Sequence, residues 1–270
     1  MVIKSVTLDE KRKGLSKNEA YLLSYLAENG KNIFTLNDIV NVLKCRYENA
    51  KVIVGRLVNK KWVIRIGKGK YLIVPLTAGV AGEYTEHEFI VASLITKDYY
   101  IGYWTALNYY GFTEQVPNKI FIATKKRLKD RKIHETCLKF VCLSKKKFFG
   151  FDNISISNLK VNISDKEKTI IDCLDKPKYC GGIEEIVKSI FFAKEEIDFK
   201  KLTNYAIKIG NNAVIKRLGF ILDFLSMDSK NLKNKISSSY SVLDPTKEKK
   251  GKYSSEWKIL INVSKEELKR

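Results

Sequence analysis

Acidic side chains in one short segment are the first residues whose types and spacing could support catalysis. Asp165, Glu167, Lys168 and Asp172 lie close together in the chain, and Asp198-Phe199-Lys200 forms a smaller group of the same kind. Metal-dependent nucleases hold divalent ions with clustered carboxylates and use a lysine to orient water. If residues 166–174 form one helix, however, Lys168 and Asp172 are i, i+4 neighbours, a spacing typical of an ion pair. We therefore predict no catalytic residues, and metal-dependent cleavage of nucleic acid is the least favoured function.

Other motifs for metal, cofactor or membrane binding are also missing from the sequence. His87 and His134 have no second ligand at helical spacing, and Gly67-Lys68-Gly69 does not precede a predicted helix as in a phosphate-binding loop. The cysteines contain no CxxC pair, which argues against a disulfide framework and a zinc site; they are Cys45, Cys137, Cys142, Cys173 and Cys180. We expect no metal, no cofactor, no signal peptide and no membrane-spanning helix, and hence a reduced, cytoplasmic protein.

A second group of polar residues has the types that read base pairs in DNA. A helical period over residues 47–59 places one set of side chains opposite an apolar stripe: Glu48, Asn49, Val52, Gly55, Arg56 and Asn59. Arg46, Tyr47 and Lys51 flank this face where the helix begins. Arginine pairs bidentately with guanine and asparagine with adenine, in a major groove wide enough to admit a helix. The sequence therefore predicts a DNA-recognition helix.

Basic residues also surround a predicted hairpin that follows this helix. Residues 62–66 and 71–74 are β-rich and are joined by Gly67-Lys68-Gly69-Lys70, whose glycines can supply the positive φ of a tight turn. Arg65, Lys68 and Lys70 lie near its tip, where they are well placed to contact phosphates or a minor groove.

Three predicted helices position these candidate residues. Ser16-Lys17-Asn18-Glu19 is a capping box that begins the first helix, and Asn29-Gly30 ends it. Thr35 opens the second helix, and Ala50, Ile53, Val54, Leu57 and Val58 form the apolar stripe of the third. Three helices followed by a hairpin predict a winged helix-turn-helix domain over residues 1–76, with a linker over 77–83.

Residues 84–270 read as a larger mixed α/β domain, so the predicted fold class is α+β. The expected helices cover residues 86–96, 104–110, 166–174, 183–194, 199–209 and 213–226. The expected strands cover residues 119–123, 138–142, 154–156, 160–163 and 257–263, and residues 244–255 are expected to form a mobile loop.

An aromatic group lies near the start of this second domain. Its members are Tyr99, Tyr100, Tyr103, Trp104, Tyr109, Tyr110 and Phe112. Packing of one helix on a sheet is the favoured interpretation, and anchoring of a protein partner is the alternative.

The net charge agrees with a polyanionic partner. Lys and Arg number 50 against 30 Asp and Glu, which leaves +20 at neutral pH. Residues 1–76 hold 15 basic and 6 acidic residues, so +9 lies in the predicted DNA-binding domain. Double-stranded DNA is the expected partner, and a basic but merely solvated surface is the alternative.

Several segments together resemble the AbiEi-type antitoxins. Residues 46–71 are similar to that family's recognition helix and basic wing, which ends in an R-x-G-x-G-x-Y pattern. Residues 100–118 resemble its aromatic-Ala-Leu-x-x-x-Gly-Leu-Thr segment, with Phe112 where leucine is usual. Residues 165–174 and 181–185 resemble its E-K-T-hydrophobic-x-D helix and Gly-Gly step. The resemblance covers roughly residues 15–227, and two wing positions carry Lys where Arg is common.

The resemblance implies an antitoxin of a type IV toxin–antitoxin operon. Its winged helix would repress the operon at inverted repeats in the promoter. Its second domain would neutralise a nucleotidyltransferase-fold toxin and assist cooperative DNA binding, with oligomerisation as a further role. The alternative is a winged-helix transcriptional regulator without a toxin partner, whose second domain oligomerises or senses a ligand.

Overall fold

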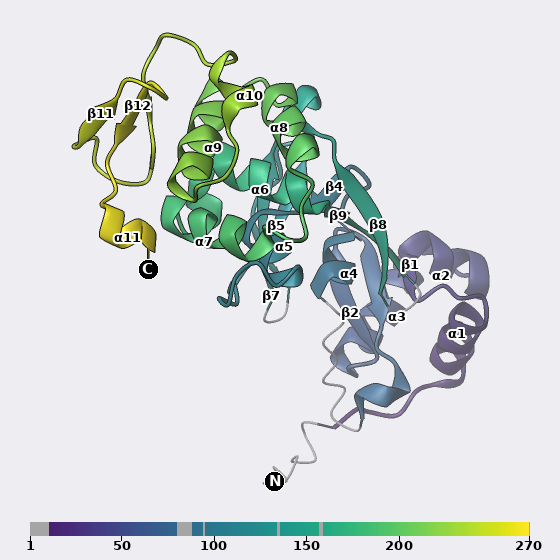
Figure 1. The fold of residues 1–270 in the computed structure, drawn as a ribbon. Coiled ribbons are helices and arrows are strands. Elements are labelled where there is room, and N and C mark those ends of the chain that lie inside the picture. Colours follow the sequence, from purple (N-terminus) through teal and green to yellow (C-terminus); the bar gives the residue numbers. More distant parts are fainter. Residues whose placement is uncertain (1–10, 80–87, 94, 134–135, 157–158, 270) are drawn as a thin grey trace, which may run out of the picture. The chain divides into compact units, whose positions relative to one another are not determined.

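The chain folds into two compact units, which comprise residues 1–87 and 88–270 (Figure 1). The computed structural model describes residues 11–79, 88–93, 95–133, 136–156 and 159–269. Residues 80–83 of the predicted linker, and both His87 and His134, lie outside these ranges. Within them, every helix is too short or too polar to cross a bilayer.

The first unit has the helix and strand order of a winged helix-turn-helix. Its elements are α1 (Lys17–Glu28), β1 (Ile33–Thr35), α2 (Leu36–Leu43), α3 (Tyr47–Asn59), β2 (Val63–Gly67) and β3 (Lys70–Ile73). The strands form one antiparallel sheet in the order β1-β3-β2, and β2 with β3 makes the wing. A single turn of 3-10 helix, Leu76–Ala78, follows. The predicted fold of this region is confirmed.

Local hydrogen bonds explain where the first two helices begin. The Ser16 hydroxyl accepts from the Glu19 backbone N–H, and the Glu19 carboxylate accepts from the Ser16 backbone N–H at 2.7 Å. Thr35 and Asp38 form the same reciprocal arrangement at the start of α2. Glu19 also pairs with Lys60, at 2.6 Å, just beyond the end of α3. These bonds satisfy N–H groups that a helix start leaves without partners.

Arg12 ties the segment before α1 to the segment after β3. Its guanidinium donates to the carbonyl oxygens of Val74 and Pro75, at 3.3 and 2.8 Å. It also lies 4.5 Å from the centre of the Trp62 ring, and the indole N–H donates to the Lys13 carbonyl at 2.8 Å. The segment before α1 is therefore held against the segment that leaves β3.

The second unit is built on a mixed six-stranded sheet in the order β6-β7-β5-β4-β9-β8. The strands are β4 (Tyr99–Ile101), β5 (Ile120–Thr124), β6 (Arg131–Ile133), β7 (Thr136–Cys142), β8 (Phe151–Ile156) and β9 (Leu159–Ser164). β5 pairs with β7 and β4 with β9 in parallel, and the other pairs are antiparallel. The expected mixed α/β architecture is confirmed.

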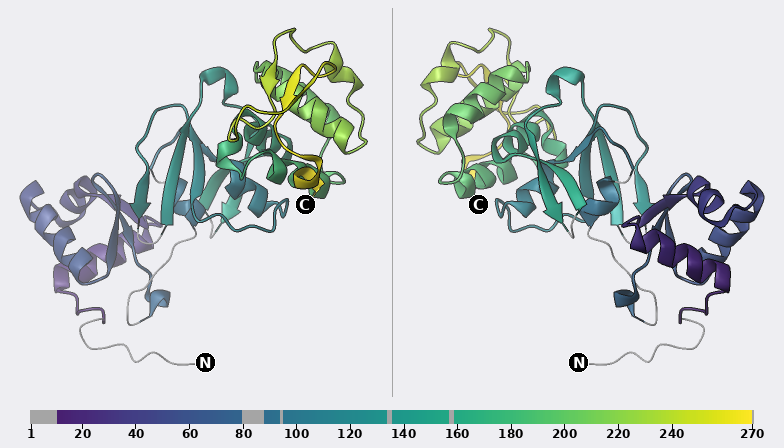
Figure 2. Two further views of the ribbon diagram at one scale, coloured as in Figure 1. Left: turned by 90° about the vertical axis from the view of Figure 1, so that its left-hand side faces the viewer. Right: turned by 90° about the vertical axis from the view of Figure 1, so that its right-hand side faces the viewer.

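Alternate residues of the strands enter two separate cores, as the period of a strand requires. Tyr100 and Phe121 face a core shared with α6 (Lys166–Asp175), α7 (Ile183–Ala193), α8 (Phe199–Lys208) and α9 (Asn212–Phe224). Ile101 and Ile122 face a smaller core covered by α4 (Glu88–Ser93). The larger helices thus gather on one side of the sheet, as Figure 2 shows, while α5 (Tyr103–Tyr109) contributes to both cores.

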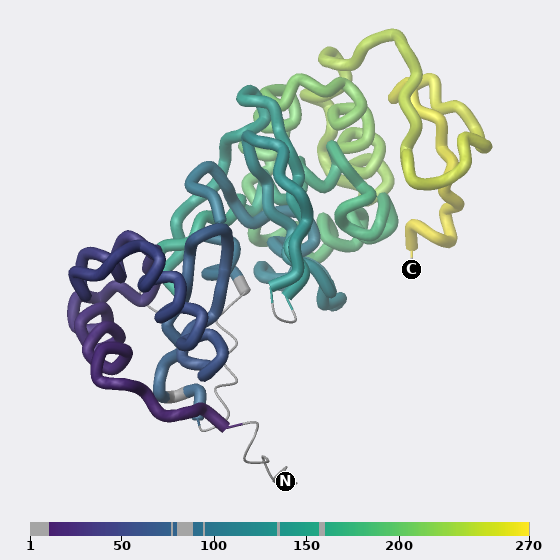
Figure 3. The backbone as a smooth tube through the Cα atoms, turned by 180° about the vertical axis from the view of Figure 1, so that it is seen from behind, coloured from purple at the N-terminus to yellow at the C-terminus, as the bar shows by residue number. Residues whose placement is uncertain are grey.

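The C-terminal segment is part of the second unit's core rather than a loose tail. It forms α10 (Lys230–Lys233), a small sheet of β10 (Ser241–Val242), β11 (Lys252–Ser254) and β12 (Ile259–Ile261), and α11 (Lys265–Lys269). Figure 3 traces this yellow segment beside the green helices. The buried Asp244 carboxylate accepts from the Ile183 N–H at 2.8 Å and so caps α7. The buried ring of Trp257 packs directly on the backbone of α9 at Gly219.

Two expectations for this segment are therefore wrong. Residues 244–255 are not simply a mobile loop, because they include β11 and the Asp244 cap. The last strand is Ile259–Ile261 rather than 257–263, because Lys258 adopts a left-handed conformation (φ 50°) that separates Trp257 from the strand. The helix expected over 86–96 is the shorter α4, Glu88–Ser93, with residues 86, 87 and 94 outside the described ranges.

We predict opposite effects on stability for two helix glycines. A Cβ at Gly219 would overlap the Trp257 ring, whereas a Cβ at Gly55 would meet nothing within 4 Å. Gly219→Ala should lower the free energy of unfolding by about 3 kcal/mol, and Gly55→Ala should raise it by about 1 kcal/mol. Urea unfolding of the full-length variants measures both. A Gly219→Ala protein as stable as the wild type would contradict the packing described here.

Candidate nucleic-acid interface

The rotation of α3 about its axis is fixed by its apolar stripe. Ala50, Val54 and Leu57 are buried in the core of the first unit, and Ile53 and Val58 pack against it. The opposite face is open to solvent, and every predicted DNA-contacting residue of this region is exposed: Arg46, Tyr47, Asn49, Lys51, Arg56 and Asn59. The structure thus gathers these side chains on and beside one helix surface.

Charged and aromatic side chains interact at the start of this face. Lys51 pairs with Glu48 at 2.8 Å, and its ammonium lies 5.1 Å from the centre of the Tyr47 ring. The hydrogen bond to Glu48 raises the pKa of Lys51, so this side chain is a cation at any physiological pH. Because exposed ion pairs contribute little stability, Lys51 can exchange Glu48 for another anion, such as a phosphate, at small cost.

The wing presents a basic tip, as predicted. Arg65, Lys68 and Lys70 are all exposed, and the Arg65 side chain donates to the Gly67 carbonyl at 3.4 Å. Gly67 and Lys70 pair across a two-residue turn in which Gly69 has a φ of +68°. Of the two glycines, only Gly69 therefore supplies the positive φ that the turn needs.

The turn between α2 and α3 has a feature that the sequence does not reveal. Lys44 is exposed and adopts a left-handed conformation, with φ 48° and ψ 38°. This conformation usually favours glycine or asparagine, so a lysine carries no recognisable signal for it. It sets the angle at which α3 leaves α2 and adds a cation beside Arg46.

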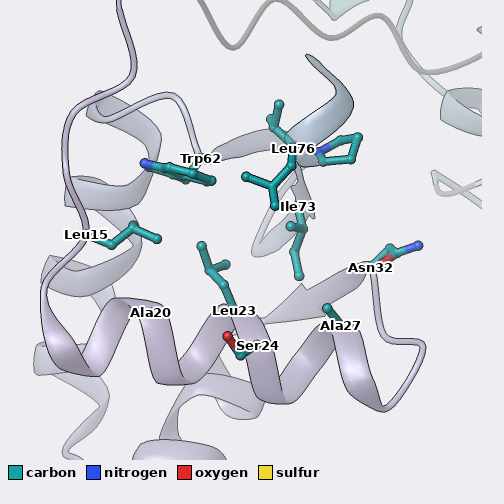
Figure 4. A pocket seen from close by; sticks show the side chains of 11 residues that line it. Leu15, Ala20, Leu23, Ser24, Ala27, Asn32, Trp62, Ile73 and Leu76 are labelled. Carbon is teal, nitrogen blue, oxygen red and sulfur yellow. The ribbon is translucent and has the colours of Figure 1, made fainter. Parts of the chain in front are cut away.

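An apolar groove of about 440 Å³ lies elsewhere on the first unit (Figure 4). Leu23, Ser24 and Ala27 of α1 form one wall, and Trp62, Ile73 and Leu76 point toward them in the close-up. No residue of the predicted DNA-contacting set lines this groove.

The carboxylates of the acidic cluster in the second unit form hydrogen bonds and ion pairs with other residues of the same unit. Asp165 caps α6 by accepting from the Lys168 N–H at 2.7 Å. Glu167 accepts from the Asp198 N–H at 2.8 Å, and Lys201 pairs with both Asp165 and Glu167, at 3.2 and 2.8 Å. Burial and Asp165 raise the pKa of Tyr205 to about 12, which keeps its hydroxyl protonated as a donor to Asp165 at 3.0 Å. Within the described ranges, no group of acidic, His or Cys side chains is arranged to hold a metal ion.

Lys168 and Asp172 do form the predicted ion pair, but it is fully buried rather than an ordinary surface pair. The Tyr100 hydroxyl completes the network, since it donates to Asp172 at 2.7 Å and accepts from Lys168 at 2.9 Å. Burial raises the pKa of Asp172 above its ordinary value, and the Lys168 ammonium opposes that rise. Gly150 leaves room for Lys168, because a Cβ there would lie 3.0 Å from the lysine side chain.

The aromatic group packs mainly into the cores, which confirms the favoured interpretation. Tyr99, Tyr100, Tyr103 and Phe112 are buried, and Trp104 and Tyr110 are half-buried. Tyr109 remains 46% exposed, and its ring packs against Phe89 and Tyr110.

A comparison with models of known protein families gives a match to the segment that contains α3 and the wing. Residues 21–74 match the model of the family described as a transcriptional regulator, AbiEi antitoxin. The segment from α1 to the wing in the first unit is therefore similar to the N-terminal domain of these transcriptional regulators and antitoxins.

A solved structure shares the fold of nearly the whole chain. It is the crystal structure of the RV2827C protein from Mycobacterium tuberculosis, with a TM-score of 0.68 and 13% sequence identity. The likeness covers 96% of each chain, so the fold of the second unit also occurs in this solved structure. No curated protein matches the chain.

We predict that the buried ion pair behaves as a structural element. Lys168→Met leaves the Asp172 carboxylate buried without its cation, which should cost about 3–5 kcal/mol of unfolding free energy. The combined change Lys168→Met, Asp172→Leu and Tyr100→Phe should recover much of that loss, because it removes all three polar groups together. Urea unfolding measures both, with exposed Lys200→Met as the matched control. A single variant no less stable than this control would refute the prediction.

Proposed function

We propose that this protein is a cytoplasmic DNA-binding antitoxin that represses its own operon. In this proposal the first unit binds inverted repeats in promoter DNA, with α3 in the major groove and the wing on the adjacent backbone. Arg46, Tyr47, Asn49, Lys51, Arg56, Asn59, Arg65, Lys68 and Lys70 make the contacts. One observation carries the proposal: an exposed polar helix face and an exposed basic wing coincide in a segment that matches the AbiEi family.

In this proposal, the polar and the basic residues contact different parts of the DNA. Asn49 and Arg56 have planar, bidentate groups suited to the edges of adenine and guanine. The lysines and Arg65 supply positive charge to phosphates, which positions the domain but carries no sequence information. The net charge of +20 favours approach to any polyanion.

The second unit carries the antitoxin part of the proposal. We infer that it counteracts a toxin with a nucleotidyltransferase fold, without the need for a stable complex. Its size supports a role beyond DNA contact, because the first unit already contains the recognition helix and the wing. A regulator without a toxin is the alternative that the experiments below separate from this one.

We predict a steep salt dependence of DNA binding that depends on the wing. Replacing Arg65, Lys68 and Lys70 together by Ala should weaken binding to all sequences, since fewer counterions are released. The slope of log K against log salt should become shallower by about 0.9 for each lost phosphate contact. Fluorescence anisotropy with the full-length protein at several salt concentrations measures the slope.

The matched control also removes three positive charges, but from the C-terminal segment instead of the wing. Lys230, Lys235 and Lys249 are exposed residues of the C-terminal segment, and their joint replacement by Ala should leave the slope unchanged. An unchanged slope in the wing variant would remove the wing from the contact surface.

We further predict that repression and toxin neutralisation can be separated. The full-length double variant Arg56→Ala, Lys68→Ala should lose promoter repression yet still rescue growth when the cognate toxin is expressed from an unrelated promoter. Reporter activity and growth measure the two functions in the same cells. If rescue instead disappears in every strain where the toxin has an unrelated promoter, the protein is a repressor only.

A further inference from the structure

The recognition face of α3 contains an apolar side chain that the polar candidates do not account for. Val52 is 52% exposed, although the apolar stripe of the same helix is buried on the opposite side. Its neighbours one turn before and after are Glu48, Asn49 and Arg56, at i−4, i−3 and i+4. A β-branched apolar residue thus lies in the middle of a surface otherwise suited to hydrogen bonding.

Gly55 leaves the helix surface bare directly beside Val52. It lies at i+3, in the interior of α3, and is exposed. Its φ is not left-handed, and a Cβ added to it would meet nothing within 4 Å, so the fold does not require glycine here. Because glycine costs a helix interior about 1 kcal/mol relative to alanine, its presence indicates a constraint from outside the domain.

Val52 and Gly55 lie next to each other on the exposed face of α3, and Val52 also neighbours Asn49 and Arg56, two residues that can read bases. In the major groove, thymine alone presents a methyl group, at C5, and apolar side chains recognise it by contact. A side chain at position 55 would hold the helix away from the bases and would prevent that contact. The exposed Val52 side chain has the chemistry of a methyl-binding contact.

We propose that Val52 reads the C5-methyl group of a thymine, with Gly55 allowing the close approach of the groove floor. This proposal rests on the DNA-binding function proposed above and adds one base-specific contact to it. The thymine lies between the base pairs contacted by Asn49 and Arg56, because Val52 lies between these residues on the helix. Readout by α3 then combines hydrogen bonds with one apolar contact.

Single replacement of thymine by deoxyuridine tests the proposal, because it removes only the methyl group. The substitution is scanned through the promoter fragment that the full-length protein protects, and the dissociation constant is measured for each duplex. At the contacted position, wild-type affinity should fall about fourfold, the value for one buried methyl group. In Val52→Ala the same substitution should have a smaller effect, because alanine offers less apolar surface to the methyl group, whereas Asn49→Ala should keep the methyl sensitivity.

Two further variants separate methyl recognition from a general loss of binding. Val116 is 82% exposed in the second unit, and Val116→Ala should retain the fourfold effect. Gly55→Ala should be more stable than the wild type but should bind the operator several-fold more weakly, with unchanged affinity for scrambled DNA.

The possible failures are distinguishable. If the protein discriminates its operator from scrambled DNA but tolerates deoxyuridine at every position, the methyl contact is wrong and the DNA-binding function stands. If Val52→Ala changes the oligomeric state and leaves the deoxyuridine effect intact, Val52 belongs to a protein contact and the proposal is overturned. If no sequence-specific binding is found, both proposals fail together.

Discussion

Burial of one stripe of α3 determines which of its side chains the first unit presents to solvent. Ala50, Val54 and Leu57 pack into the core formed with α1, α2 and β2, so α3 cannot rotate without exposing apolar surface. The polar face therefore has a fixed direction, and the wing follows from the end of the same helix. Lys60, just beyond α3, pairs with Glu19 of α1, which anchors that end of the helix. The candidate interface is thus supported by the core of the first unit.

The second unit shows why clustered acidic residues are ambiguous in a sequence. Asp165, Glu167 and Asp172 have the types and spacing of metal ligands, yet folding uses each carboxylate for a cap or an ion pair. A buried pair such as Lys168–Asp172 contributes little net stability, because desolvation offsets the attraction between the charges. Its Tyr100 partner on β4 nevertheless fixes how α6 lies against the sheet. Each of these carboxylates therefore has a partner within the fold of the second unit.

Local signals explain which parts could be predicted from the sequence. Capping boxes and helical periodicity were sufficient for the three helices of the first unit and for the exposed face of α3, because both depend on neighbouring residues. They did not predict β1, which pairs with β3 and has only three residues. β4 and β6 are three-residue strands defined by their partners in the sheet, and no periodicity marks them. The left-handed Lys44 and the cap from Asp244 to α7 were equally hidden, since each depends on the tertiary structure.

The Arg12 clamp has a consequence for how such a protein can arise. It brings the described chain just before α1 and the chain just after β3 to one place in the first unit. The family match over residues 21–74 lies between these two points of the chain. A compact segment with adjacent ends can be inserted into another chain, or replaced, without disturbing the core on either side.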